Sequence, residues 1–229
     1  MADITNELRA TERERPGRRV WDWPAVAGIA FGVLFFLGFA IGLVESPEND
    51  ARLQEWVDWA TDSSNGQRAL LGVYLWVLAS LAFVVFAGGL TRRIRISHGE
   101  GSLAAAHVHG FGLLTAALLV ASAVAENAGP VAHILDSEGD IPDPTSAMFF
   151  HQIGSIGYLL LTVGTALALA ALVATTGVSL RDSMPKWFTY FNYATAVILV
   201  ASIAFVPILL IPIWPLTAGM VFLRRPVAA

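Results

Sequence analysis

The sequence predicts an all-α fold, a polytopic bundle of transmembrane helices, and two features of its composition carry that prediction. Of the 229 residues, 55% are hydrophobic and only 14% are charged, and the mean hydropathy is +0.62. A soluble domain carries about 25% charged residues, so this composition is typical of a chain that lies in a lipid bilayer. A third observation, the length of the apolar stretches, predicts the number of crossings.

Four apolar stretches are long enough to cross a bilayer, at 24–44, 69–90, 103–125 and 147–174. Each reaches the roughly 20 helical residues that span a hydrocarbon core of about 30 Å. A fifth apolar region, 187–223, would be about 55 Å long as one helix, which is more than tilting can absorb. We therefore predict that it turns near Pro207 and forms two further spans, 187–205 and 208–223, which gives six in total.

The distribution of charge supports an even number of crossings. The N-terminal tail and the connections 91–102 and 175–186 are basic, whereas the connections 45–68 and 126–146 are acidic. With six spans, 12 of the 14 lysines and arginines fall on one side, the two C-terminal arginines included. By the positive-inside rule that side is the cytoplasm. The sequence thus predicts a multi-pass cell-membrane protein with both termini cytoplasmic.

These boundaries divide the chain into a cytoplasmic tail at 1–20, a six-helix transmembrane domain at 21–225 and a short cytoplasmic tail at 226–229. Asp22, ahead of Pro24, is a candidate N-cap for the first span. In the first external connection, apolar residues recur with helical spacing over 50–61. This predicts a short helix that either lies on the outer leaflet or packs as a cap on the bundle.

The proline-rich end of the chain has two interpretations. It is either a tight hairpin at the outer surface or a discontinuous helix of the kind that lines substrate sites in secondary transporters. No Asp, Glu, Lys or Arg lies well inside any of the six predicted spans. Because helix breaks in transporters usually occur with polar or ionisable partners, we favour the hairpin.

The fourth predicted span carries the most regular polar pattern. Its members, spaced i, i+4, i+7, i+11 and i+14, are His151, Ser155, Tyr158, Thr162 and Thr165. They fall within an arc of about 80° on one helix face. His107, Thr115 and Ser122 share a similar arc in the third span, and Asn192 adds an amide in the fifth. These residues either line a polar groove between spans three to five or bond to helix carbonyls as packing contacts.

Glycines in the first predicted span form a second pattern. Gly28, Gly32, Gly38 and Gly42 lie on one face about 120° wide and make two GxxxG pairs. Such a face lets two helices approach closely, as an internal contact or as a dimer seam. In a six-helix bundle we favour the internal contact.

The sequence contains no pattern typical of an enzyme or a metal site. Cysteine is absent, which excludes disulfides and thiolate ligands. His107 and His109 lie about 20 Å from His151 by helix rise, and the acidic stretch 136–144 lacks the glycine and the glutamate of a calcium loop. We predict no enzymatic activity, no cofactor, no bound metal and no nucleic-acid partner.

Three segments resemble a family of uncharacterised bacterial polytopic integral membrane proteins, a domain of unknown function. They are "NGQRALLGVYLWVLASLAFVVFAGGLTRRIR" (65–95), "MPKWF" (184–188) and "PLTAGMVFLRR" (215–225). The resemblance implies a helical bundle in the bacterial inner membrane and supplies no functional residues.

Two functions from different classes remain open. The first is a non-catalytic accessory or scaffold protein that contacts lipid and another membrane protein or a second copy of itself. The second is a passive carrier, or a protein that binds a small molecule or lipid, and that uses the polar groove.

Overall fold

The computed structural model describes residues 22–42, 51–135, 144–202 and 206–225, and all regular elements in those ranges are helical. The α-helices are α2 (Trp23–Gly42), α3 (Leu53–Thr61), α4 (Ser63–His98), α5 (Leu103–Glu126), α6 (Ala128–Leu135), α7 (Pro144–Leu159), α8 (Ala166–Ser179), α9 (Lys186–Val200) and α10 (Leu210–Arg224). A π-helical segment, η1 (Leu160–Thr165), joins α7 to α8, and a 3-10 turn, η2 (Val206–Leu209), precedes α10. The predicted all-α class is confirmed.

Four helices are long and apolar enough to cross a membrane, which supports the prediction of a membrane protein. They are α2, α4, α5 and the continuous helix Gln152–Ser179 that contains η1 and α8. Helices α9 and α10 have 15 residues each, about 22 Å by helix rise and less than the hydrocarbon core of about 30 Å. A crossing by these two is therefore a proposal about topology and does not follow from helix length.

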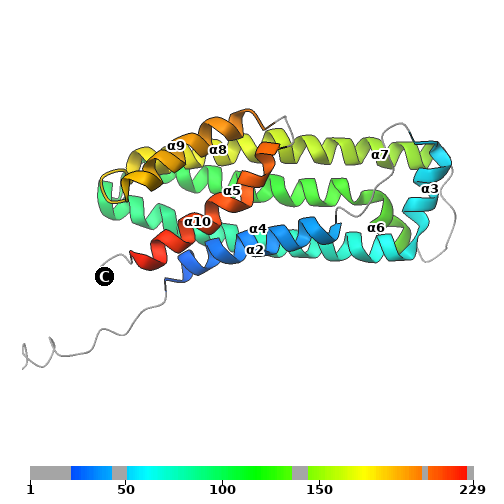
Figure 1. Ribbon diagram of the computed structural model, residues 1–229, viewed down its shortest axis with the longest axis horizontal. Helices are drawn as coiled ribbons and strands as arrows, with labels where there is room; N and C mark the ends of the chain where they lie inside the picture. Colours follow the sequence, from blue (N-terminus) through cyan, green and yellow to red (C-terminus); the bar gives the residue numbers. More distant parts are fainter. Residues whose placement is uncertain (1–21, 43–50, 136–143, 203–205, 226–229) are drawn as a thin grey trace, which may run out of the picture.

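The long helices lie side by side along the long axis of the molecule (Figure 1). Helix α4 packs between α2 and α5, and α5 packs in turn against α7, η1 and α8. Helix α9 lies on α8, while α10 crosses obliquely over α2. The two helices of the predicted hairpin therefore pack mainly against other helices and only weakly against each other. Both cover the half of the bundle nearer the C-terminus (Figure 1).

The hairpin differs in detail from the predicted spans. Helix α9 ends at Val200, before the predicted 205, because the N–H groups of Ala201 and Ser202 make the short-range bonds of a closing turn. Helix α10 begins at Leu210, after η2, and keeps Pro212 in its first turn. A proline there removes an N–H that would have no partner in any case.

Helix α4 extends beyond the predicted span 69–90 at both ends. At its start the Asp62 carboxylate accepts from the Ser64 N–H at 2.7 Å, as a side-chain cap does. At its end Gly99 adopts φ 90°, a left-handed conformation that favours glycine, and the chain turns into α5. With 36 residues α4 is about 54 Å long, so it extends past a bilayer.

Short helices cover the end of the bundle opposite the C-terminus (Figure 1). The helix predicted at 50–61 forms as α3 and packs against α4, α6 and α7, so it is part of a cap. Helix α6, which the sequence analysis did not predict, follows α5 directly and lies along the start of α4. A Cβ built on Gly66 would be 2.5 Å from a side-chain carbon of Ile134, so glycine permits this approach.

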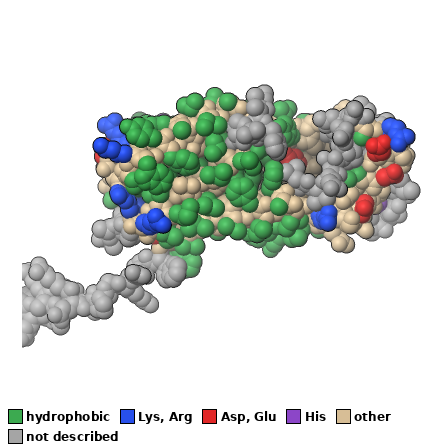
Figure 2. Space-filling view, in the orientation of Figure 1, with side chains coloured by type: hydrophobic (Ala, Val, Ile, Leu, Met, Phe, Trp, Pro, Cys, Tyr) green, Lys and Arg blue, Asp and Glu red, His purple; other side chains and the backbone are tan. Residues whose placement is uncertain are grey.

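The face shown in Figure 2 has an apolar middle and charged ends. Lysine and arginine gather at the end that holds the C-terminus, and most of the acidic side chains in view lie at the capped end. Two exposed apolar side chains illustrate the middle band, Val197 at 72% and Leu81 at 60% exposure. Exposed side chains of this kind suit contact with lipid.

Candidate functional site

The predicted polar stripe lies on α7 and η1, and its burial changes along the helix. Ser155 is exposed and Tyr158 is 37% exposed. Thr162 and Thr165 are completely buried. His151 lies in α7, but its side chain falls outside the described residues. Among the described side chains, the Ser155 end of the stripe is thus accessible and its Thr165 end is enclosed by the bundle.

The threonine hydroxyls bond within their own helices. Thr162 donates to the carbonyl of Tyr158 at 2.8 Å, and Thr165 donates to that of Leu160 at 3.0 Å. On the facing helix, Thr115 donates to the carbonyl of Phe111 at 2.7 Å. Each of these hydroxyl protons is used inside a helix, in the way that Ser and Thr commonly bond to preceding carbonyls.

Two serines instead bond between helices. Ser122 of α5 donates to the carbonyl of Gly157 in α7 at 2.8 Å. Ser202, which follows α9, donates to the carbonyl of Thr162 in η1. We call the contact of α5 and of Ser202 with the continuous helix of α7 and η1 the hydroxyl seam, defined by Ser122, Thr162, Thr165 and Ser202. All four of its hydroxyl groups donate to backbone carbonyls.

The carbonyl of Thr162, which accepts from Ser202, belongs to the π-helical segment η1. In a regular α-helix the N–H of Ala166 would donate to the carbonyl of Thr162. Here it donates to the carbonyls of Leu161 and Val163 instead. Ser202 supplies a donor at this position. Short π-helical segments are rare in α-helices and often occur at functional sites. Here the segment provides the carbonyl to which Ser202, after the end of α9, is bonded.

Two other predicted groove residues lie apart from this seam. His107 is exposed near the start of α5, with its ring 6.3 Å from that of Phe111. Asn192 is buried and accepts from the indole N–H of Trp214 at 2.7 Å. That bond joins α9 to α10. The structure therefore brings Thr115, Ser122 and the stripe into one region and leaves His107 and Asn192 outside it.

The four glycines of α2 face other helices of the same chain. A Cβ on Gly28 would lie 2.6 Å from a ring carbon of Phe86 in α4 and 2.8 Å from the Pro215 carbonyl oxygen in α10. The neighbours of the others are Leu216 for Gly32, Trp76 for Gly38 and Gly72 for Gly42. We call this contact of α2 with α4 and α10 the glycine seam.

Aromatic side chains fill the space beside the glycine seam. The Phe35 and Trp76 rings stack with centroids 5.0 Å apart, and the indole N–H of Trp76 donates to the Phe35 carbonyl at 3.1 Å. The Phe31 and Phe83 rings lie 4.9 Å apart. Large rings and glycines therefore alternate across this contact, which lets the helices approach while their side chains remain packed.

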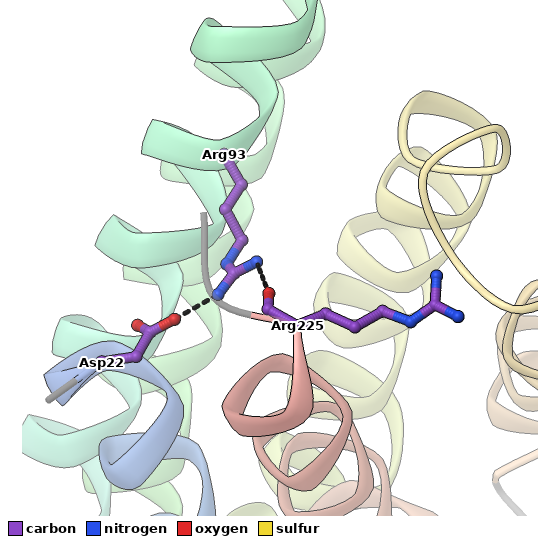
Figure 3. A network of polar contacts seen from close by, with 3 residues as sticks. All are labelled: Asp22, Arg93 and Arg225. Atoms are coloured by element: carbon purple, nitrogen blue, oxygen red, sulfur yellow. Dashed lines mark hydrogen bonds and ion pairs between the residues drawn. The ribbon is translucent and has the colours of Figure 1, made fainter. Parts of the chain in front are cut away.

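A buried arginine joins three chain segments at the end of the bundle that holds the C-terminus (Figure 3). Arg93 of α4 pairs with the Asp22 carboxylate and donates to the Arg225 carbonyl at 3.1 Å. Its guanidinium carbon also lies 4.4 Å from the ring centroid of Phe222. The start of α2, the end of α4 and the end of α10 are thus held together.

The sequence analysis treated Arg93 only as one of several cytoplasmic charges. The sequence did contain a sign that Arg93 is buried. It continues the helical spacing of Phe83, Phe86 and Leu90, which form the buried face of α4. Asp22 was predicted as a helix cap. Its carbonyl does accept from the N–H groups of the first turn, while its carboxylate binds Arg93.

Glu126 was assigned to the external connection, but it is the last residue of α5 and packs on α7. A carboxyl group therefore lies one turn from Ser122, next to the polar stripe. Only its spacing of four residues from Ser122 could have indicated this position.

The described residues contain no group of three or more His, Asp or Glu side chains that could hold a metal ion. His107 and His109 are both exposed. No protein-family model, curated protein or solved structure matches this chain. The resemblance to uncharacterised bacterial membrane proteins therefore stays a prediction.

Proposed function

We propose that this chain crosses the membrane six times and has a non-catalytic role, as an accessory or scaffold protein for a partner in the membrane. The hydroxyl seam carries the proposal. Its donors are bonded to backbone carbonyls within the bundle, so none is directed at a substrate. A packed interior of this kind suits a protein whose interactions take place on its outer surfaces.

The six-crossing topology is supported by the position of the chain ends. Arg93 holds the start of α2 next to the end of α10, so an even number of crossings agrees with the contacts. The basic end then faces the cytoplasm. The bacterial inner membrane is the location that the sequence resemblance implies. We include both termini in the cytoplasm as part of the proposal.

Accessibility of the C-terminus tests this topology. A single cysteine at residue 229 should be protected from a membrane-impermeant thiol reagent in intact cells and should react after the membrane is opened. A cysteine at Gln54, which is exposed in α3, should react in intact cells. Labelling of residue 229 from outside would contradict six crossings.

The packed interior is tested by two further single cysteines. Thr162→Cys should not react with a small water-soluble thiol reagent, because a thiol needs water to form its reactive thiolate. Leu159→Cys, on the exposed side of the same helix, should also be unreactive in lipid. Reaction at Thr162 would show a solvated passage and contradict the proposal.

The accessory role predicts a specific neighbour. Photo-cross-linking residues placed at Gln54 of α3 and at Val197 of α9 should give one discrete cross-linked product in native membranes. The two positions are tested in separate variants. One variant should be joined to a protein, while in the other the cross-linking residue contacts lipid or water. If mass spectrometry finds no protein joined at either position, the scaffold proposal is wrong.

A second candidate is a passive carrier, or a protein that binds a small molecule or lipid between spans three to five. The exposed outer end of the polar stripe, at Ser155 and Tyr158, favours it. In this case cysteines at Ser155 and Thr162 should both react, and a bound ligand should slow the reaction at both.

A further inference from the structure

Glu126 ends α5 in a position that only glycine in the neighbouring helix permits. A Cβ built on Gly157 of α7 would lie 2.5 Å from the Glu126 nitrogen and 2.8 Å from its Cγ. One built on Gly154 would lie 3.6 Å from the Glu126 carbonyl oxygen. The last turn of α5 therefore rests on the backbone of α7, and this contact holds the carboxyl group at the helix interface.

No cation balances this carboxyl group among the residues that the structure describes. The ion pairs found there join Arg52 to Glu55, Arg93 to Asp22 and Arg181 to Asp182. Arg52 and Arg68 are the only lysines or arginines in the connections 45–68 and 126–146. Arg52 is already paired, and Arg68 points outward as an exposed side chain of α4.

Other titratable groups on the helices that pack against this end of α5 are Tyr74 of α4, His133 of α6 and Tyr158 of α7. None of them forms an ion pair with Glu126 in the described part of the chain. His151 also belongs to α7, but its side chain is outside the described residues. An ionised Glu126 would thus be a partly buried charge with no cation beside it in the described residues, which is costly in a membrane bundle.

The hydroxyl group of Ser122 restricts the hydrogen bonds that Glu126 can make. Ser122 has one proton, which it donates to the Gly157 carbonyl at 2.8 Å. Glu126 lies one helical turn after Ser122 on the same face of α5, so its carboxyl group can reach the same hydroxyl. The Ser122 oxygen can therefore only accept from Glu126. A neutral carboxylic acid has the proton that this bond requires, and a carboxylate does not.

We propose that Glu126 is a proton-binding site at the contact between α5 and α7. Its carboxylic acid donates to the Ser122 oxygen, and Ser122 donates to the Gly157 carbonyl, so one continuous hydrogen-bonded chain joins the two helices. Loss of the proton leaves a carboxylate that competes with the Gly157 carbonyl for the single Ser122 proton. Ionisation therefore weakens the contact of α5 with α7.

The first test compares stability across pH in the full chain and in Glu126→Gln. The proposed hydrogen-bonded chain requires the carboxylic acid, so the free energy of unfolding should fall as pH rises and Glu126 ionises. The glutamine amide of the variant keeps a donor for Ser122 and cannot ionise. The variant should therefore lose this part of the pH dependence. Identical pH profiles for the two proteins would overturn the proposal.

Ser122→Ala is a second variant for the same measurement. It leaves the carboxyl group in place and removes the acceptor for its proton, so its pH dependence should be weaker than that of the wild type. A profile as steep as that of the wild type would show that Ser122 does not hold the proton, which contradicts the proposed chain. This variant also keeps the test decisive if Glu126→Gln does not fold.

The third test is chemical modification by a lipid-soluble carbodiimide. The carboxylic acid adds its O–H across one C=N bond of the reagent, and the adduct rearranges to a stable N-acylurea without a leaving group. The acid must be protonated, so mass spectrometry should find Glu126 modified in membranes, with at least tenfold less modification at high pH than at neutral pH. Exposed Glu55 is the control within the same chain. Modification of Glu126 no greater than that of Glu55 at neutral pH would refute the proposal.

Discussion

The glycine seam and the hydroxyl seam join helices in different ways. In the glycine seam α2 approaches α4 and α10 because Gly28, Gly32 and Gly38 lack a side chain, and aromatic rings fill the remaining space. In the hydroxyl seam Ser122 and Ser202 donate to carbonyls of the helix that contains η1. The first contact depends on shape and the second on hydrogen bonds, so the two should respond differently to mutation.

This difference predicts an order of effects. Lipid is as apolar as leucine, so close packing must supply much of the association between membrane helices. A side chain that is too large in such a contact strains the structure by about 1–3 kcal/mol. Hydrogen bonds between membrane helices contribute about 0.6 kcal/mol on average. Loss of one hydroxyl should therefore matter less than one added side chain in the glycine seam.

The largest effect is expected for Gly28→Leu. The Cβ alone would lie 2.6 Å from a Phe86 ring carbon and 2.8 Å from the backbone oxygen of Pro215, and the backbone cannot move aside without shifting α10. We expect a loss of about 3 kcal/mol in the free energy of unfolding, measured by denaturation in mixed micelles. Gly88→Leu is the matched control, because no atom lies within 4 Å of its built Cβ. Equal effects for the two variants would contradict the importance of the glycine seam.

The next effect is expected at the polar end of the glycine seam, for Arg93→Gln. Removal of the guanidinium leaves the Asp22 carboxylate unpaired, with its side chain 18% exposed. Breaking a fully buried pair costs about 3–5 kcal/mol, and the partial exposure of Asp22 should lower this to about 2 kcal/mol. Arg92→Gln, at an exposed neighbouring position, should change the free energy of unfolding little. A similar loss in both variants would show that total charge matters more than the pair.

Asn192→Leu tests the side-chain hydrogen bond between α9 and α10. It leaves the buried indole N–H of Trp214 without its acceptor, which should destabilise the fold by about 1–2 kcal/mol. In a double-mutant cycle, Trp214→Phe should make the leucine substitution less harmful, because the unpaired donor is then absent. Additive effects in this cycle would argue against an energetic coupling between the two side chains.

The smallest effect is expected for Ser202→Ala in the hydroxyl seam. It removes the donor to the Thr162 carbonyl, and we expect a loss of about 0.6 kcal/mol in the free energy of unfolding. Thr165→Val, which removes a hydroxyl that bonds within its own helix, is the control and should have a smaller effect. A loss above about 2 kcal/mol for Ser202→Ala would place the hydroxyl seam on a level with the glycine seam.

Several details of the fold departed from the sequence prediction for identifiable reasons. Helix α4 runs past the predicted 69–90 because the polar residues after Asp62 are compatible with a helix that packs against α6, outside the apolar stretch. Hydropathy identifies only the apolar part of such a helix. Helix α6 was missed because its eight residues are too few for a span and because its contacts, with α3, α4, α5 and α7, are visible only in the tertiary structure.

The candidate site was predictable only in part. Helical spacing placed Thr162 and Thr165 on one face, and both are buried together. The same spacing grouped Asn192 with them, although its partner is Trp214 of α10. Periodicity shows which residues share a face, but it does not show which helix that face meets.

Composition and hydropathy by themselves determined the all-helical class and four helices able to cross a membrane, because in lipid a chain must satisfy its backbone hydrogen bonds locally. The tertiary structure decided the pairing of Arg93 with Asp22, the attachment of Ser202 to the π-helical turn and the position of Glu126 on Gly157. The first two of these contacts join residues 71 and 40 positions apart in the chain. All three depend on the relative placement of helices, which the period of a single helix does not contain.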